Sequence, residues 1–482
     1  MADVVETCRE ALIVERSECA QDELGKSLVA VLLTLHNPMQ AQQGRHMFKY
    51  YLQLGLLSLR RNPVLTALMV MAIGFGVASS MTTYTVLRAL SGDPIPWKSD
   101  KLFFPQIDAW GPNPRRKGTE PRDALTYIDA VSLMRDHRAH LQSALYPIAP
   151  TVHSDDPTLK SRTAPGQAVY SEFFPMVDAP FEYGGGWTAA DDEQHAKVAV
   201  ISRSLNQKLF KGENSVGRSI QLDSHSYRVG GVLDDWHPKP KFYGLATTDA
   251  FGPADQVFLP FTTATDAQLA TRRWFSCINL PGPGYAAILN SGCVWIGYMA
   301  ELDTASQVSA YRNYLDGYAQ DQRASGRFGW APNNRLRDLP AWLDFEQVVP
   351  SQTKMSFVVA LCLLLVCMVN TIGLLLAKFL RRSGEIGVRR ALGASRLAIA
   401  AQFGVEAGTI GLAGGVLGLM LTWLGVQVLR VSLPRQIAAL SRIDLLLLWQ
   451  TLLLAVVATV LAGLYPIWRA MYVRPSLQLK ED

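Results

Sequence analysis

MSFVVALCLLLVCMVNTIGLLLA at residues 355–377 is followed directly by KFLRRSGEIGVRRALGASR at residues 378–396. The first stretch carries no charge and exceeds the roughly 20 apolar residues that cross a bilayer as a helix. The second contains six lysines and arginines against one acid, Glu385. Because basic residues near the ends of spans are retained in the cytoplasm, the pair predicts a transmembrane helix that ends in a cytoplasmic connector, which we place at 378–400.

Three further runs without charge occupy residues 62–87, 407–429 and 445–468. Helices of soluble proteins rarely stay uncharged for more than about five turns, so we predict that all four runs span the membrane. The predicted fold class is a membrane protein with four transmembrane α-helices and a large α/β domain inserted between helices 1 and 2. The spans are placed at 62–90, 355–377, 403–429 and 443–468.

The flanks of the spans predict their orientation. Arg60 and Arg61 precede the first span, and Arg469 follows the fourth, so both termini are expected in the cytoplasm. The large segment 91–350 and a short loop, 430–442, then lie outside. That loop contains three arginines, contrary to the preference of basic residues for the cytoplasmic side, and we expect them to contact lipid headgroups or the large domain.

The two ends of the chain differ in character from the spans. Residues 1–46 are expected to be a disordered extension or to precede a functional start at Met47, and they show no cleavable signal peptide pattern. Residues 47–61 are predicted to form an amphipathic cytoplasmic helix, and residues 469–482 a cytoplasmic tail.

The segment 91–350 alternates short β-like runs with helical stretches. Val198–Ser202 and Ser226–Leu233 are rich in β-branched residues, and Arg203–Phe210 between them is predicted to be a helix. Two more helices are predicted at 122–140 and 304–318. Strand, helix and strand in this order indicate an α/β domain.

This outer segment contains two of the six cysteines, Cys277 and Cys293. In an oxidising compartment they would form a disulfide that closes a loop of about 16 residues, worth around 3 kcal/mol in the chain-entropy model. The sequence leaves open whether the two cysteines are bonded.

A search for chemistry predicts no catalytic, cofactor-binding or metal site. His137 and His140 are more typical of a solvated helix face than of a metal site, and Asp234, Asp235 and His237 precede prolines that indicate an exposed connection. Gly25-Lys-Ser27 ends like a phosphate-binding loop but lacks the required glycine at Ala20. The net charge of +5 comes mainly from the flanks of the spans, so no nucleic-acid partner is expected.

The third span is rich in glycine, which lets helix backbones approach closely in lipid. We predict a tight helix pair, within the subunit or across a dimer, against the alternative of ordinary glycine enrichment. Glu406 is expected at the cytoplasmic boundary, where it stays hydrated, and charges within the spans are otherwise absent, which disfavours a polar route between them. The predicted packing glycines are Gly404, Gly408, Gly411, Gly414, Gly415 and Gly418.

Glu385-Ile-Gly-Val-Arg-Arg-Ala-Leu-Gly-Ala394, Gln402-Phe-Gly-Val-Glu406 and Tyr465-Pro-Ile-Trp-Arg-Ala470 resemble the C-terminal permease signature of the MacB/FtsX-type ABC transporter family. Glu172-Phe-Phe174 and Val198-Ala-Val-Ile201 are similar to the MacB-type periplasmic core. The resemblance implies a dimer of four-span permeases in the bacterial inner membrane, with a periplasmic outer domain and two cytoplasmic ATPase subunits. The second permease subunit is a copy of this chain or a related one.

The resemblance further implies that the short helix after Glu385 contacts the ATPase. This ATPase is a separate polypeptide that binds ATP and Mg²⁺. The alternative for this segment is a basic loop that only sets topology. The implied contact residues are Glu385, Ile386, Gly387, Arg389, Arg390, Ala391, Leu392 and Gly393.

The expected function is a permease subunit of an exporter that expels periplasmic substrates such as peptides, antibiotics or lipid-linked molecules. A periplasmic adaptor and an outer-membrane channel are open further partners. The alternatives are a lipoprotein-releasing permease, an FtsX-like regulator without transport, and a membrane-anchored outer enzyme that would act without ATP.

Overall fold

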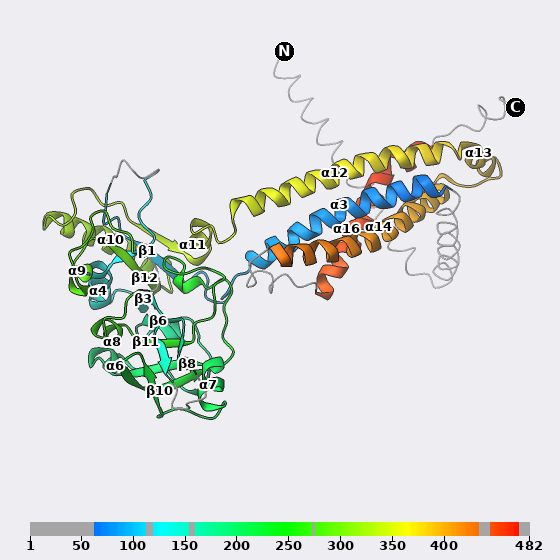
Figure 1. Cartoon of the computed structure of the whole chain (residues 1–482). Helices are drawn as coiled ribbons and strands as arrows, with labels where there is room; N and C mark the ends of the chain where they lie inside the picture. Colours follow the sequence, from blue (N-terminus) through cyan, green and yellow to red (C-terminus); the bar gives the residue numbers. More distant parts are fainter. Residues whose placement is uncertain (1–61, 112–118, 154–159, 272–274, 433–443, 472–482) are drawn as a thin grey trace, which may run out of the picture. The chain divides into compact units, whose positions relative to one another are not determined.

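The computed structural model describes residues 62–111, 119–153, 160–271, 275–432 and 444–471 (Figure 1). The chain divides into two compact units, the bundle of long helices and the segment 86–355, and each is described by itself. The predicted extension 1–46 and the lead-in helix 47–61 lie outside the described residues. So do residues 433–443, which make up most of the predicted outer loop, and residues 472–482 of the tail.

Among the described residues, four helices are long and apolar enough to cross a membrane, which confirms the predicted number of spans: α3 (Pro63–Leu90), α12 (Ser351–Leu380), α14 (Arg396–Ser432) and α16 (Leu445–Met471). Their ends differ from the prediction. Both α12 and α14 extend into the predicted connector 378–400, since α12 continues to Leu380 and α14 begins at Arg396. What remains of the connector is a short helix, α13 (Ser383–Ala391).

Aromatic residues mark both ends of α16. Trp449 lies near its start and Trp468 near its end, and both side chains are exposed. At 1.5 Å rise per residue they lie about 28 Å apart along the helix axis. This matches the thickness of the hydrocarbon core, at whose two interfaces tryptophan is enriched.

Glycines bring α14 into close contact with two neighbouring helices. A Cβ on Gly411 would lie 2.9 Å from Thr459 Oγ1 of α16, and one on Gly415 would lie 3.1 Å from Ala455 Cβ. On the adjacent face, a Cβ on Gly414 would lie 2.9 Å from Ile73 Cγ2 of α3, and one on Gly418 would lie 3.3 Å from Val77 Cγ1. Four of the predicted packing glycines therefore lie at contacts within the chain.

Gly404 and Gly408 differ from these four. Among the described residues, no heavy atom outside the glycine's own turns of helix backbone and its chain neighbours lies within 4 Å of a Cβ built on either glycine. Their role in helix packing stays a prediction.

We expect Gly411→Ala to destabilise the bundle by about 1–3 kcal/mol, because the added methyl overlaps α16. Gly408→Ala, which meets open space, should be neutral or gain up to about 1 kcal/mol through helix propensity. Thermal unfolding in detergent measures both variants. Equal effects of the two substitutions would contradict the packing assigned to Gly411.

The outer unit is built on one mixed sheet with the strand order β13-β1-β12-β3-β6-β11-β8-β10-β9-β4-β5, with β2 on β12 and β7 on β10. The pairs β8/β10 and β6/β11 are parallel, and the other strand pairs are antiparallel. The strands are β1 (Leu102–Gln106), β2 (Leu125–Thr126), β3 (Leu141–Ile148), β4 (Thr151–His153), β5 (Arg162–Thr163), β6 (Gly166–Val169), β7 (Phe181–Gly184), β8 (Val198–Ser202), β9 (Ser219–Leu222), β10 (His225–Leu233), β11 (Val257–Pro260), β12 (Val294–Glu301) and β13 (Arg335–Asp338).

Both faces of this sheet are covered, because apolar residues alternate between two cores. In β8, Ala199 and Ile201 face one core and Val198 and Val200 the other. The helices that contribute to the cores and the loops are α4 (Tyr127–Asp136), α5 (Phe173–Met176), α6 (Ala189–Glu193), α7 (Arg203–Phe210), α8 (Phe261–Asp266), α9 (Tyr285–Leu289), α10 (Ala305–Ala324) and α11 (Leu339–Phe345), with a 3₁₀ turn, η1 (Phe242–Gly244).

The predicted strand 198–202 and helix 203–210 are confirmed with the same bounds, and the second strand begins one residue earlier than predicted. The helix predicted at 122–140 is wrong in extent. Thr126 is extended and its side chain accepts from Asp129 N, which starts α4 at Tyr127, and His137 ends it in a left-handed conformation. The helix predicted at 304–318 continues to Ala324 as α10.

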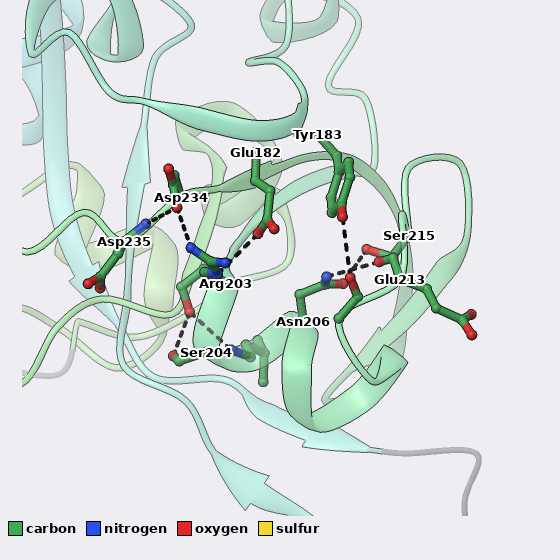
Figure 2. Close-up of polar contacts among 12 residues, drawn as sticks. Glu182, Tyr183, Arg203, Ser204, Asn206, Glu213, Ser215, Asp234 and Asp235 are labelled. Carbon is green, nitrogen blue, oxygen red and sulfur yellow. Dashed lines mark hydrogen bonds and ion pairs between the residues drawn. The ribbon is translucent and has the colours of Figure 1, made fainter.

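Polar contacts hold α7 against the neighbouring strands (Figure 2). Arg203 Nη1 lies 2.8 Å from Asp234 Oδ1, and its Nε lies 3.5 Å from Glu182 Oε2. Asn206 accepts from Ser215 Oγ at 2.6 Å and donates to the Glu213 carbonyl at 3.0 Å. Asp234, which the sequence places in an exposed connection, is thus engaged in a half-exposed ion pair of modest energetic weight.

The structure joins Cys277 and Cys293 in a disulfide, with Cα atoms 4.3 Å apart. The bond lies beside a backbone bridge in which Ser276 and Val294 exchange hydrogen bonds of 3.2 and 2.9 Å. Cys293 is buried against the sheet. The loop that contains α9 is therefore attached to the start of β12.

Replacing both cysteines, Cys277→Ser with Cys293→Ser, should lower stability around β12 by about 3 kcal/mol, since the open loop gains entropy when unfolded. Hydrogen exchange of β12 peptides in the full-length chain measures the loss. Cys362→Ser, at an exposed free cysteine of α12, is the control and should leave that exchange unchanged.

Candidate functional site

The short helix α13 joins two of the long helices and carries most of the predicted contact residues (Figure 1). It ends at a sharp turn where Gly393 has φ +94°, a conformation that favours glycine. In this turn Gly393 N donates to the Arg390 carbonyl at 3.1 Å. Ser395 Oγ then accepts from Ala398 N at 3.1 Å and caps the start of α14.

One apolar side chain anchors α13 in the bundle. Ile386 is buried in a cluster to which all four long helices contribute, and Gly387 beside it is buried as well. Phe379 of α12 and Phe403 of α14 lie in the same cluster, with ring centroids 4.2 Å apart. α13 is therefore packed against the spans and is not a free loop.

Charged residues form a buried network at the base of α13. Glu406 of α14 is 2% exposed, and Lys378 of α12 is fully buried. Lys378 Nζ lies 2.8 Å from Glu406 Oε1, and Arg382 Nη1 lies 3.1 Å from Glu406 Oε2. The expectation of a hydrated Glu406 is wrong, because a position at the cytoplasmic boundary of one span does not show what neighbouring helices cover, and Lys378 and Arg382 lie against its carboxylate.

The polar residues predicted to contact a partner also make contacts within the chain. Arg389 Nη2 lies 2.8 Å from Glu385 Oε1, and its Nη1 donates to Gln402 Oε1 at 2.6 Å. Arg390 Nη1 donates to the carbonyl of Met471 at the end of α16 at 3.1 Å. These side chains hold α13 in place, and their predicted role toward a partner stays a prediction.

Three large apolar side chains lie exposed on and just after α13. Val388 is 55% exposed, Leu392 84% and Leu397 79%. Of these, the sequence prediction included only Leu392. The missed signal was an apolar side chain recurring at 388, 392 and 397 within a segment that is otherwise basic.

Truncating the anchor tests how α13 is held. Ile386→Ala should cost about 2–4 kcal/mol of stability, since it leaves a cavity in the shared core. Val388→Ala, on the exposed side of the same helix, should change stability by less than about 0.5 kcal/mol. Thermal unfolding in detergent compares the two, and similar losses would contradict the buried position of Ile386.

Several titratable residues of the outer unit are engaged in structural contacts. Within the described residues, no group of three or more His, Cys, Asp or Glu side chains could hold a metal ion. His137 Nε2 lies 2.7 Å from Glu172 Oε1 and so takes part in a surface pair. Burial raises the pKa of the Asp192 carboxyl, which accepts from Ser171 N and Trp187 Nε1 at 2.8 and 2.9 Å.

Two shallow hollows of about 500 and 440 Å³ adjoin this cluster and share Ser171, Glu172 and Ala189. The carboxylate of Glu172 is already engaged by His137 and by the Gln142 backbone. Neither hollow brings together a set of groups that predicts a reaction.

Comparison with known proteins identifies both units. Residues 66–316 match the family model described as a MacB-like periplasmic core domain, and residues 357–475 match the model described as FtsX-like permease C-terminal. The macrolide export ATP-binding/permease protein MacB of Salmonella typhi is 23% identical over 416 residues, covering 80% of this chain and 54% of that protein. MacB of Azoarcus sp. is 25% identical over 373 residues, covering 76% and 50%.

The chain thus spans about half the length of the curated relatives it matches. Among solved structures, the periplasmic region of MacB from Actinobacillus actinomycetemcomitans covers 52% of this chain and 94% of its own, with 12% identity and a TM-score of 0.34. The extracellular domain of the noncanonic ABC-type transporter YknZ covers 49% and 99%, with 11% identity and a TM-score of 0.32.

Proposed function

The chain belongs to the MacB/FtsX-type permease family, and from this premise we propose that it is the membrane-spanning subunit of an ABC exporter. A cytoplasmic ATPase binds at α13, and its cycle of ATP binding and hydrolysis moves the helix bundle. The outer unit follows this motion and expels substrates from the periplasm, with peptides, antibiotics and lipid-linked molecules as the proposed classes.

The observation that carries this proposal is the exposed apolar surface at Val388, Leu392 and Leu397. The topology predicted from the basic flanks places it in the cytoplasm, where exposed apolar surface is unfavourable unless a partner covers it. The surface begins on the short helix α13 that joins α12 and α14, and it continues through the turn after α13 to the start of α14. A partner bound there can push on α12 and α14 together.

The packing of α13 supports a mechanical role. Ile386 lies in a core shared by the four spans, so a displacement of α13 strains contacts throughout that core. Closely packed interiors pass such strain on, because they shift between discrete arrangements and do not deform continuously. α3 and α12 lead along the chain directly into the outer unit and are the route by which motion reaches it.

The proposed partners follow from this role. ATP and Mg²⁺ bind to the ATPase, a second permease subunit completes the dimer, and a periplasmic adaptor with an outer-membrane channel extends the path. The match of the outer unit to the MacB-like periplasmic core domain favours the exporter over the FtsX-like regulator.

The double variant Leu392→Asp with Leu397→Asp should reduce the ATPase that co-purifies with the full-length chain from its native host by about tenfold or more. Losing two central apolar contacts costs more than the 1.4 kcal/mol that corresponds to a factor of ten. Leu280→Asp is the matched control, since Leu280 is 92% exposed in the outer unit, and it should leave recovery unchanged.

Undiminished recovery with the double variant would contradict the assigned surface. If the unchanged chain yields no ATPase, and a variant with Arg389→Cys yields none after crosslinking through that cysteine, the proposed function itself is wrong.

A further inference from the structure

Three charged residues from consecutive parts of the chain meet in the interior of the helix bundle. Lys378 belongs to the last turn of α12, Arg382 is the residue that precedes α13, and Glu406 lies in α14. Each carboxylate oxygen of Glu406 faces a different cation, Oε1 facing Lys378 at 2.8 Å and Oε2 facing Arg382 at 3.1 Å. One carboxylate therefore links three helices.

The surroundings make this link sensitive to displacement. Lys378 is fully buried and the Glu406 side chain is 3% exposed, so water does not replace a lost partner at this position. An isolated charge in such a place is strongly unfavourable, whereas a paired one is tolerated. A shift of α13 that separates Arg382 from Glu406 therefore meets a steep restoring force.

The second contact between α13 and α14 uses the same face of α14. Gln402 precedes Glu406 by four residues, which places both side chains on one side of the helix. Gln402 accepts from Arg389, in the last turn of α13, while Glu406 contacts Arg382 at the other end of α13. The two ends of α13 are thus attached to one face of α14.

We propose that Glu406 is the positioning residue that fixes α13 to α14, so that a push on α13 moves α14 and is not lost as a local rotation of the short helix. This inference rests on the proposed function for the source of the push. The geometry of the link belongs to the chain itself and is measurable without a partner.

The test uses the full-length chain in lipid nanodiscs, without ATPase or nucleotide. Cys8, Cys19, Cys362 and Cys367 are replaced by serine, the outer disulfide is kept, and spin labels are attached through Val388→Cys on α13 and Val416→Cys on α14. Both label positions are exposed. Double electron–electron resonance then reports how tightly the position of α13 is defined relative to α14.

Glu406→Gln should widen the distance distribution at least about twofold, because Arg382 loses its charged partner on α14 and keeps its contact to Glu385 of α13, while Lys378 is left uncompensated. It should also lower the temperature of unfolding. Glu385→Gln is the matched control, since it makes the same chemical change at a half-exposed position on α13. It removes the carboxylate that Arg382 and Arg389 contact on α13, but it leaves the contacts of both arginines to α14 in place. The control should keep the distribution narrow.

A second variant separates positioning from stability. Lys378→Met with Glu406→Gln leaves no uncompensated charge at position 378, so the unfolding temperature should return toward that of the unchanged chain. The distribution should stay wide, because Arg382 still lacks its partner on α14. This variant keeps the test informative if Glu406→Gln alone fails to fold.

Two results would overturn the inference. The first is a distribution with Glu406→Gln as narrow as that of the unchanged chain. The second is a double variant that recovers both the stability and the narrow distribution. Neither result depends on recovery of an ATPase, so failure of the proposed function and failure of this inference are distinguishable.

Discussion

Hydrocarbon offers no hydrogen-bond partners, and this constraint determines how the bundle is built. Each span has to satisfy its own backbone, so the four uncharged runs are helices from end to end. Lipid is as apolar as leucine, so helices associate through close packing and not through hydrophobic burial. Gly411 and Gly415 meet this need toward α16, and Gly414 and Gly418 meet it toward α3.

The same constraint explains the buried charges. An ionised carboxylate inside the bundle is tolerated only when cations compensate it, and Glu406 has Lys378 and Arg382 in contact. Few arrangements of the helices place two cations beside the Glu406 carboxylate. The need for this compensation therefore makes the carboxylate a specific link between α12, α13 and α14. This link and the buried side chain of Ile386 fix the position of α13. Leu392 and Leu397, which follow α13 in the chain, are exposed.

The outer unit follows the physics of water-soluble domains. Its sheet alternates apolar residues between two cores, which requires cover on both faces. Local caps set the helix bounds: Thr126 starts α4, and Ser202 starts α7 directly at the end of β8. The disulfide attaches one long loop to this frame. The described residues of the unit form no metal-ligand cluster.

Much of the architecture follows from the sequence by itself. Charge-free length predicts the spans, and β-branched runs next to a polar cap predict β8 and α7, because these signals depend on neighbours along the chain.

Packing partners depend on residues far apart in sequence. Only the tertiary structure decided that Glu406 is buried, since its cover comes from α12, and that Arg389 turns toward Gln402 while Leu392 is exposed. The connector 378–400 was predicted from its charges, but its candidate contact surface is apolar, because folding engages several of those charges inside the chain.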